Sequence, residues 1–141
     1  MKGEAASSVA AMVGEADDYR SEISFDEALR LYQAILRETG GEYGFVSEGT
    51  LRYILDALTW MHGDVFSKAA YVIREIAGRH PLVNGNKRLA FALGALLLRR
   101  AGYELSVGSD ETIALMLRVA RAEVSSEELE SWLRSRSKKI Y

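Results

Sequence analysis

The chain has 141 residues, of which 48% are hydrophobic, and its 18 basic and 20 acidic residues leave a formal net charge of −2. This length is enough for one domain with a proper core, and the charge gives no overall electrostatic drive toward nucleic acid or a membrane surface. The sequence has no cysteine, which excludes disulfides, thiolate nucleophiles and cysteine-ligated metals.

Two segments are candidates for a targeting or membrane-spanning role. Residues 1–13 lack the continuous apolar core of a signal peptide. The most apolar run, residues 89–98, is shorter than the ~20 residues that a membrane-spanning helix needs. We therefore expect a soluble cytoplasmic protein, with neither a membrane nor a specific nucleic acid as its partner.

A single proline and few alternating apolar segments predict a mostly α-helical fold. Residues 1–22 are rich in small and acidic residues, and we expect them to form a frayed extension or a short helix. The remainder, residues 23–141, shows no internal repeat and no long linker, which predicts a single domain.

The first predicted helix begins at a capping box, in which the Ser24 hydroxyl accepts from the backbone of Glu27 and the Glu27 side chain reaches back. Two glycines, Gly40 and Gly41, are typical of the end of this helix. Between these signals, apolar residues recur at helical spacing and define one face: Leu29, Tyr32, Ile35 and Leu36.

The next segment, residues 40–47, interleaves glycine with aromatic and β-branched residues, which favours a short irregular strand or hairpin. Ser47 can cap a second helix, whose apolar face comprises Leu51, Ile54, Leu55 and Leu58. A third helix is predicted from about Asp64 to Ala77.

A helix over residues 86–100 is apolar on nearly all sides, which is typical of the central helix of a bundle. Residues 103–107 are expected to be extended. Ser109 can cap a helix that runs through Val119, and Ser125 with Glu128 predicts a capping box for the last helix. The basic segment 134–139 is expected to be solvated.

The loop before the central helix concentrates residues that can do chemistry: His80-Pro81-Leu82-Val83-Asn84-Gly85-Asn86-Lys87-Arg88. A helix N-terminus presents unpaired amides and about half a positive elementary charge, so it attracts phosphate. Arg88 can donate two parallel hydrogen bonds to a phosphate, and Lys87 adds a compact positive charge. His80 can accept a proton from a hydroxyl, and the Asn84 carbonyl is a weak ligand for Mg²⁺. Base, anion site and metal ligand are the requirements of phosphoryl or nucleotidyl transfer.

Each of these residues also has an ordinary structural interpretation. A lone histidine is more often structural than catalytic, adjacent cations usually form a solvated face, and Asn-Gly is commonly a turn. The concentration of all of them before an apolar helix favours the functional interpretation. His62, the other histidine, has no neighbouring cations, and we interpret it as structural or as a surface residue.

At these nine residues the chain resembles the Fic/Doc family. The family motif has His first, usually Phe third, Asp or Glu fifth, then a small residue, Asn, and Arg at its end. Here His80, Gly85, Asn86 and Arg88 match. Lys87 follows the pattern of the death-on-curing (Doc) branch, where typical Fic AMP-transferases carry glycine. Weaker similarity extends the resemblance over roughly residues 23–135.

The resemblance implies a mostly α-helical Fic fold, a helical bundle with a short β-hairpin flap. It implies His80 as the general base, and Gly85, Asn86, Lys87 and Arg88 as the phosphate-binding residues. ATP would be the substrate and Mg²⁺ the metal. The flap would hold the target segment by strand addition, and its residues are Glu42, Tyr43, Gly44, Phe45 and Val46.

In the Doc branch the reaction is phosphorylation of a threonine in elongation factor Tu, and the toxin is held by an antitoxin. The resemblance therefore implies a toxin that phosphorylates a protein hydroxyl and has an antitoxin partner. Transfer of AMP, as in most Fic proteins, is the first alternative. The second is a catalytically weakened binding module, because Asn84 stands where the family carries its metal-binding carboxylate, and Leu82 where it usually carries Phe.

Overall fold

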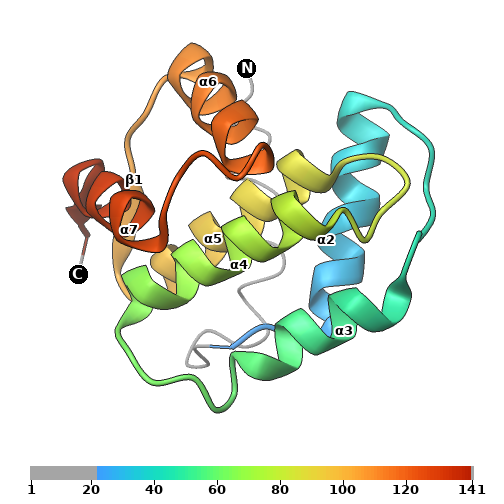
Figure 1. The fold of residues 1–141 in the computed structure, drawn as a ribbon, viewed down its shortest axis with the longest axis horizontal. Coiled ribbons are helices and arrows are strands. Elements are labelled where there is room, and N and C mark those ends of the chain that lie inside the picture. Colours follow the sequence, from blue (N-terminus) through green and yellow to red (C-terminus); the bar gives the residue numbers. More distant parts are fainter. Residues whose placement is uncertain (1–21, 141) are drawn as a thin grey trace.

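The computed structural model describes residues 22–140. Of the extension expected over residues 1–22, residues 1–21 lie outside the described residues. Within that range the mostly α-helical fold is confirmed, with one short antiparallel strand pair (Figure 1). The elements are α2 (Phe25–Thr39), α3 (Glu48–Ala57), α4 (Val65–Arg79), α5 (Asn86–Arg100), β1 (Tyr103–Leu105), α6 (Ser109–Ala120), α7 (Ser126–Ser135) and β2 (Ser137–Lys139).

The helices α4 and α5 form the centre of the fold (Figure 1). α5 packs along α4 and also contacts α2, α6 and β1, which agrees with its apolar sequence. Gly94 in α5 permits the close approach of α4, because a Cβ built at that position would lie 2.5 Å from Cδ1 of Ile73. No helix of the described range is both long and apolar enough to cross a membrane.

The predicted caps are largely confirmed. In the first capping box the Glu27 amide donates to the Ser24 hydroxyl at 3.1 Å, and the Ser24 amide donates to Oε1 of Glu27 at 3.0 Å. Ser47 caps α3 through the amide of Thr50.

Two predicted caps near the C-terminus differ in detail. Ser125 accepts from the amide of Glu128, but the Glu128 carboxylate pairs with Arg118 at 3.3 Å, so this second box is half formed. Gly108, rather than Ser109, occupies the N-cap of α6, and Ser109 is the first helical residue.

The strand pair lies elsewhere than the flap. β1 pairs antiparallel with β2, and Tyr103 lies opposite Lys139. Lys138 and Lys139 are exposed, as expected for a solvated basic tail, but residues 137–139 also form the strand that pairs with β1, which was not predicted. Residues 40–47 contribute one isolated bridge, between Phe45 and Leu82, instead of a hairpin of their own.

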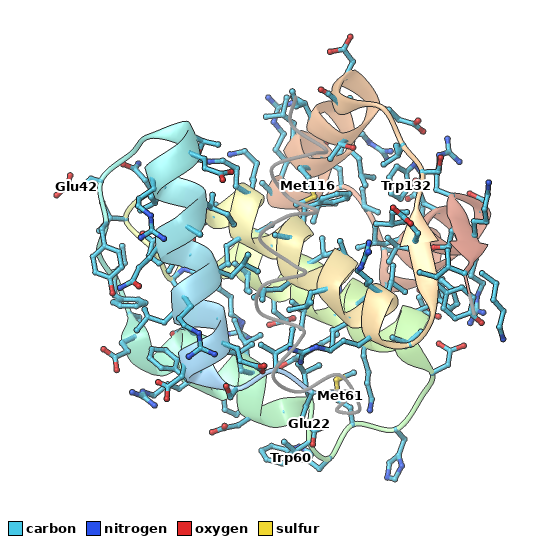
Figure 2. All side chains as sticks on the ribbon, turned by 180° about the vertical axis from the view of Figure 1, so that it is seen from behind. Glu22, Glu42, Trp60, Met61, Met116 and Trp132 are labelled. Carbon is cyan, nitrogen blue, oxygen red and sulfur yellow. The ribbon has the colours of Figure 1, made fainter. Side chains whose placement is uncertain are left out.

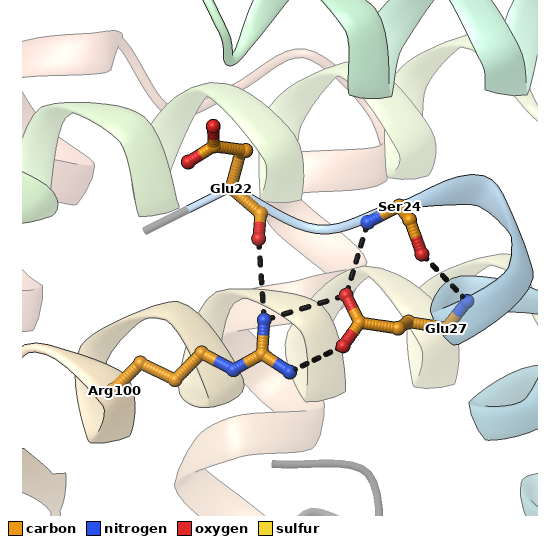
Figure 3. A network of polar contacts seen from close by, with 4 residues as sticks. All are labelled: Glu22, Ser24, Glu27 and Arg100. Atoms are coloured by element: carbon orange, nitrogen blue, oxygen red, sulfur yellow. Dashed lines mark hydrogen bonds and ion pairs between the residues drawn. The ribbon is translucent and has the colours of Figure 1, made fainter. Parts of the chain in front are cut away.

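A buried ion pair holds the start of α2 against the end of α5 (Figure 3). Nη2 of Arg100 lies 2.7 Å from Oε2 of Glu27, and the two side chains are 3% and 2% exposed. Burial by itself raises the pKa of Glu27. The hydrogen bonds from Arg100 and from the Ser24 amide lower it by more, so the pKa is below its ordinary value. Nη1 of Arg100 also donates to the Glu22 carbonyl. This network fixes the two helices whose other ends frame the candidate site.

Candidate active site

The loop between α4 and α5 begins at His80, which has left-handed backbone angles (φ 53°, ψ 57°). Its amide donates to the Ile76 carbonyl at 3.1 Å and so caps α4, while the imidazole is exposed. A left-handed conformation is strained for a residue with a Cβ, and such strain gathers at functional sites. The buried Pro81 and Leu82 anchor the chain immediately after it. The loop therefore presents His80 at its rim on a fixed backbone.

The flap lies antiparallel along this loop. The Val46 amide donates to the Pro81 carbonyl at 2.8 Å, and the Val83 amide donates to the Gly44 carbonyl at 2.9 Å. The side chains of Tyr43 and Val46 remain exposed. Two segments that the sequence indicated separately thus form one surface.

Asn86 closes the loop with its side chain. Its Oδ1 accepts from the Leu82 amide and its Nδ2 donates to the Leu82 carbonyl, both at 2.9 Å. Both ends of the side-chain amide are therefore used within the loop. An anion would meet the backbone amide of Asn86 rather than its side chain.

The start of α5 presents backbone amides without side-chain caps from residues 22–140. Gly85 is the N-cap, with φ 88° and ψ 13°, and no side chain of the described part of the chain caps this helix. The first helical backbone bond runs from Leu89 to Gly85 at 2.8 Å. The amides of Asn86, Lys87 and Arg88 precede it, and such amides have no partner within a helix. Lys87 is exposed beside them.

Arg88 spans from α5 to the end of α2. Its Nη1 donates to the Gly40 carbonyl at 2.9 Å and contacts the Thr39 hydroxyl. A cation is favoured at a helix C-terminus, where the carbonyls are unpaired. Nη2 points to the loop, since it lies 3.7 Å from where a Cβ of Gly85 would be. One arm of the guanidinium is thus used structurally, and Nη2 lies close to Gly85, the N-cap of α5.

Asn84 is tied to the flap. Its Oδ1 accepts from the Glu42 amide at 2.7 Å, and its backbone carbonyl accepts from the Tyr32 hydroxyl at 3.0 Å. Oδ1 is the atom expected to bind the metal. Among residues 22–140, no cluster of three or more His, Asp or Glu side chains could hold a metal ion. Mg²⁺ bound with a nucleotide usually takes one or two protein carboxylates, whereas Asn84 offers an uncharged oxygen already engaged with the Glu42 amide, so this position fits Mg²⁺ poorly.

Tyr32 is part of the site although the sequence analysis placed it only on an apolar face. It is fully buried, and its hydroxyl lies 3.2 Å from the Gly44 carbonyl and accepts from the Gly44 amide at 3.3 Å. Its ring stacks on Tyr43, with centroids 5.2 Å apart. The signal was present in the sequence, because a tyrosine within an aliphatic stripe needs a buried partner for its hydroxyl.

His62 lies outside the site, on the exposed connection between α3 and α4. This position agrees with its interpretation as a surface residue. Glu42 is exposed at the far side of the flap, and its side chain points away from the body of the molecule (Figure 2).

Comparison with known proteins identifies a family for most of the described chain. A sequence model of the Fic/DOC family matches residues 22–98, which is more than half of the 141-residue chain. The matched range contains α2, the flap, the motif loop and most of α5, and thus every residue of the candidate site. The weaker similarity expected beyond residue 98 lies outside it, and the match does not distinguish the Doc branch. A search of curated proteins found no match.

Proposed function

The chain belongs to the Fic/DOC family, whose members are generally transferases that modify proteins, and on this premise we propose that it moves a phosphoryl group from ATP to a serine or threonine hydroxyl of a protein. The observation that carries the proposal is Lys87, in the Doc-type position of the motif, beside the uncapped start of α5. In AMP-transferases of the family that position is typically glycine.

The proposed mechanism uses positioning and charge. The target hydroxyl oxygen attacks the γ-phosphorus, His80 takes the proton of that hydroxyl, and ADP leaves with the electrons of the bond to the γ-phosphorus. The amides at the start of α5, with Lys87 and Arg88, stabilise the phosphate oxygens. The flap holds the target segment, since it already lies antiparallel beside the loop and exposes Tyr43 and Val46.

The proposed biological role follows the Doc resemblance. The chain would act as a toxin on translation, with elongation factor Tu as the target and a small antitoxin protein as its inhibitor. Arrest of growth on expression, relieved by the product of a neighbouring gene, would support this role. Unaffected growth on expression of an active protein would contradict it.

The type of transfer is tested with two labels. Protein is incubated with cell extract and ATP labelled at either the γ or the α phosphate. We expect transfer of the γ label only, and its loss in His80→Ala. His62→Ala is the matched control, because it removes the other exposed histidine and should leave transfer unchanged. Transfer of the α label alone would replace this proposal by AMP transfer.

A non-catalytic binding module is a second candidate, and one observation favours it. Asn84 uses its Oδ1 to hold the flap and carries no charge. If ATP raises the melting temperature while neither label is transferred, and Asn84→Asp creates transfer, the module interpretation holds. Transfer by the unaltered protein eliminates it.

A further inference from the structure

Hydrogen-bond donors, rather than carboxylates, surround the position of Asn84 in the motif loop. We infer that this site binds phosphate groups directly, without a divalent cation between them and the protein. The inference deepens the proposed function, on which its choice of ATP rests. It concerns the chemistry of recognition, which can be tested separately from transfer.

The side-chain amide of Asn84 is oriented with its oxygen toward the flap. The hydrogen bond from the Glu42 amide, at 2.7 Å, assigns Oδ1 to the flap side. Nδ2, which has two hydrogens, is then the end of the side chain that can meet a ligand. A donor at this position attracts a phosphate oxygen and repels a cation. An amide oxygen already engaged with a backbone N–H is also a weaker cation ligand than a carboxylate.

The guanidinium of Arg88 lies near Asn84. A Cβ built on Gly41 would lie 3.3 Å from Nη2 of Arg88 and 3.3 Å from Cβ of Asn84. Nη2 of Arg88 and Cβ of Asn84 are therefore at most twice that distance apart. The guanidinium thus lies beside the residue that would coordinate the metal. A divalent cation there would meet a like charge, and Asn84 itself supplies no carboxylate to offset it.

The carboxylate of the flap points away from the anion site. Glu42 is the acidic residue of the flap, and its side chain points outward (Figure 2). The groups at and near the start of α5 that can donate to an anion are the amides of residues 86–88, Nδ2 of Asn84, Nζ of the exposed Lys87 and Nη2 of Arg88, and the last two belong to cations. Two positive charges match the negative charge that a metal would otherwise neutralise.

Calorimetric titration of the full chain tests the inference with two probes, ATP and inorganic pyrophosphate. Each is titrated in EDTA and in excess MgCl₂. We expect both to bind in EDTA, with Kd values within about threefold of those in MgCl₂. Binding that needs MgCl₂, or that MgCl₂ tightens about tenfold or more, overturns the inference. So does the absence of binding of both probes in EDTA.

The same titrations separate this inference from the proposed function. Pyrophosphate binding in EDTA without ATP binding supports direct phosphate recognition and contradicts the use of ATP. ATP binding in EDTA without any label transfer supports the inference and contradicts the transferase proposal.

Two variants sharpen the result. Asn84→Asp keeps an acceptor for the Glu42 amide but replaces the donor by a charge. We expect about tenfold weaker pyrophosphate binding in EDTA, recovered in MgCl₂. Unchanged affinity in EDTA would overturn the inference. If this variant fails to fold, Lys87→Gln, at an exposed position, should weaken binding in EDTA and in MgCl₂ by similar factors. A loss confined to MgCl₂ would contradict direct recognition.

Discussion

The hydroxyl of Tyr32, on the fully buried side of α2, lies 3.0 Å from the backbone carbonyl oxygen of Asn84, which is 52 residues further along the chain. The same hydroxyl reaches the flap at Gly44. One buried polar group therefore connects the first helix, the flap and the loop. The flap and the anion site are held as one unit, and this determines how the variants below should behave.

Tyr32→Phe should weaken the attachment of the flap without creating a cavity in the core. The ring remains, but the Asn84 carbonyl and the Gly44 backbone lose their buried partner, at a cost of about 1–3 kcal/mol in the free energy of unfolding. Hydrogen exchange should accelerate at the amides of Gly44 and Glu42. Tyr53→Phe is the control, because Tyr53 is 62% exposed. Unchanged exchange in the flap would show that the hydroxyl does not hold it.

Because the backbone at His80 is left-handed, different substitutions there should change stability differently while all abolish transfer. Glycine adopts this conformation without the steric cost of a Cβ, whereas alanine bears a cost of about 1 kcal/mol. His80→Gly should therefore be more stable than His80→Ala by about that amount, while both lose transfer. Denaturant unfolding and the labelled-ATP assay measure the two effects. Equal stability of the two variants would argue against a strained backbone at residue 80.

The buried pair of Glu27 and Arg100 should make stability dependent on acid. Hydrogen bonds outweigh burial and lower the pKa of Glu27 below its ordinary value, which is near 4.5. Its contribution is present above that value and is lost as the pH falls through the lowered pKa. Glu27→Gln should cost about 2–4 kcal/mol at neutral pH, because it leaves the Arg100 charge buried and unpaired. The variant should also show less loss of stability in acid.

The control for Glu27 is Glu128→Gln. Glu128 pairs with Arg118 at 3.3 Å, but its side chain is 51% exposed. An exposed pair contributes about 0–1 kcal/mol, so denaturant midpoints at pH 7 should barely change. Equal losses in the two variants would contradict a special role for the buried pair.

Two glycines in neighbouring helices should respond to alanine with opposite signs. A Cβ at Gly94 would lie 2.5 Å from Cδ1 and 2.7 Å from Cγ1 of Ile73, so Gly94→Ala must displace the Ile73 side chain or the helix that carries it and should cost about 1–3 kcal/mol. A Cβ at Gly78 meets nothing within 4 Å. Gly78→Ala should therefore stabilise the protein by up to about 1 kcal/mol, through helix propensity alone. Thermal melts of both variants provide the comparison.

Much of the fold could be predicted because its signals are local. The capping box at Ser24, the glycine at the end of α2 and the apolar length of α5 depend on residues within a few positions of each other. The motif loop was likewise found as a continuous stretch of nine residues, and the family match includes it. The helical bounds followed, within a few residues, from hydrophobic spacing and caps.

The strand pair and the flap could not be placed in this way. β1 and β2 are three-residue strands separated by two helices, and a basic stretch such as residues 137–139 shows no alternation that predicts a strand. The flap forms no hairpin because its backbone bonds go to the loop at residues 81–83 instead. In both cases the partner of the segment lies far away in the sequence.

The helices, most of their caps and the family motif can be read from the amino-acid sequence, as can the types of residue available to an anion. How those residues are used depends on the folded arrangement. It assigns the Asn86 side chain to the loop, one arm of Arg88 to the end of α2, and Oδ1 of Asn84 to the flap. The physical reason is that a side-chain amide or guanidinium has several equivalent donors and acceptors. Which of them remains for a ligand depends on neighbours that only folding brings within hydrogen-bond distance.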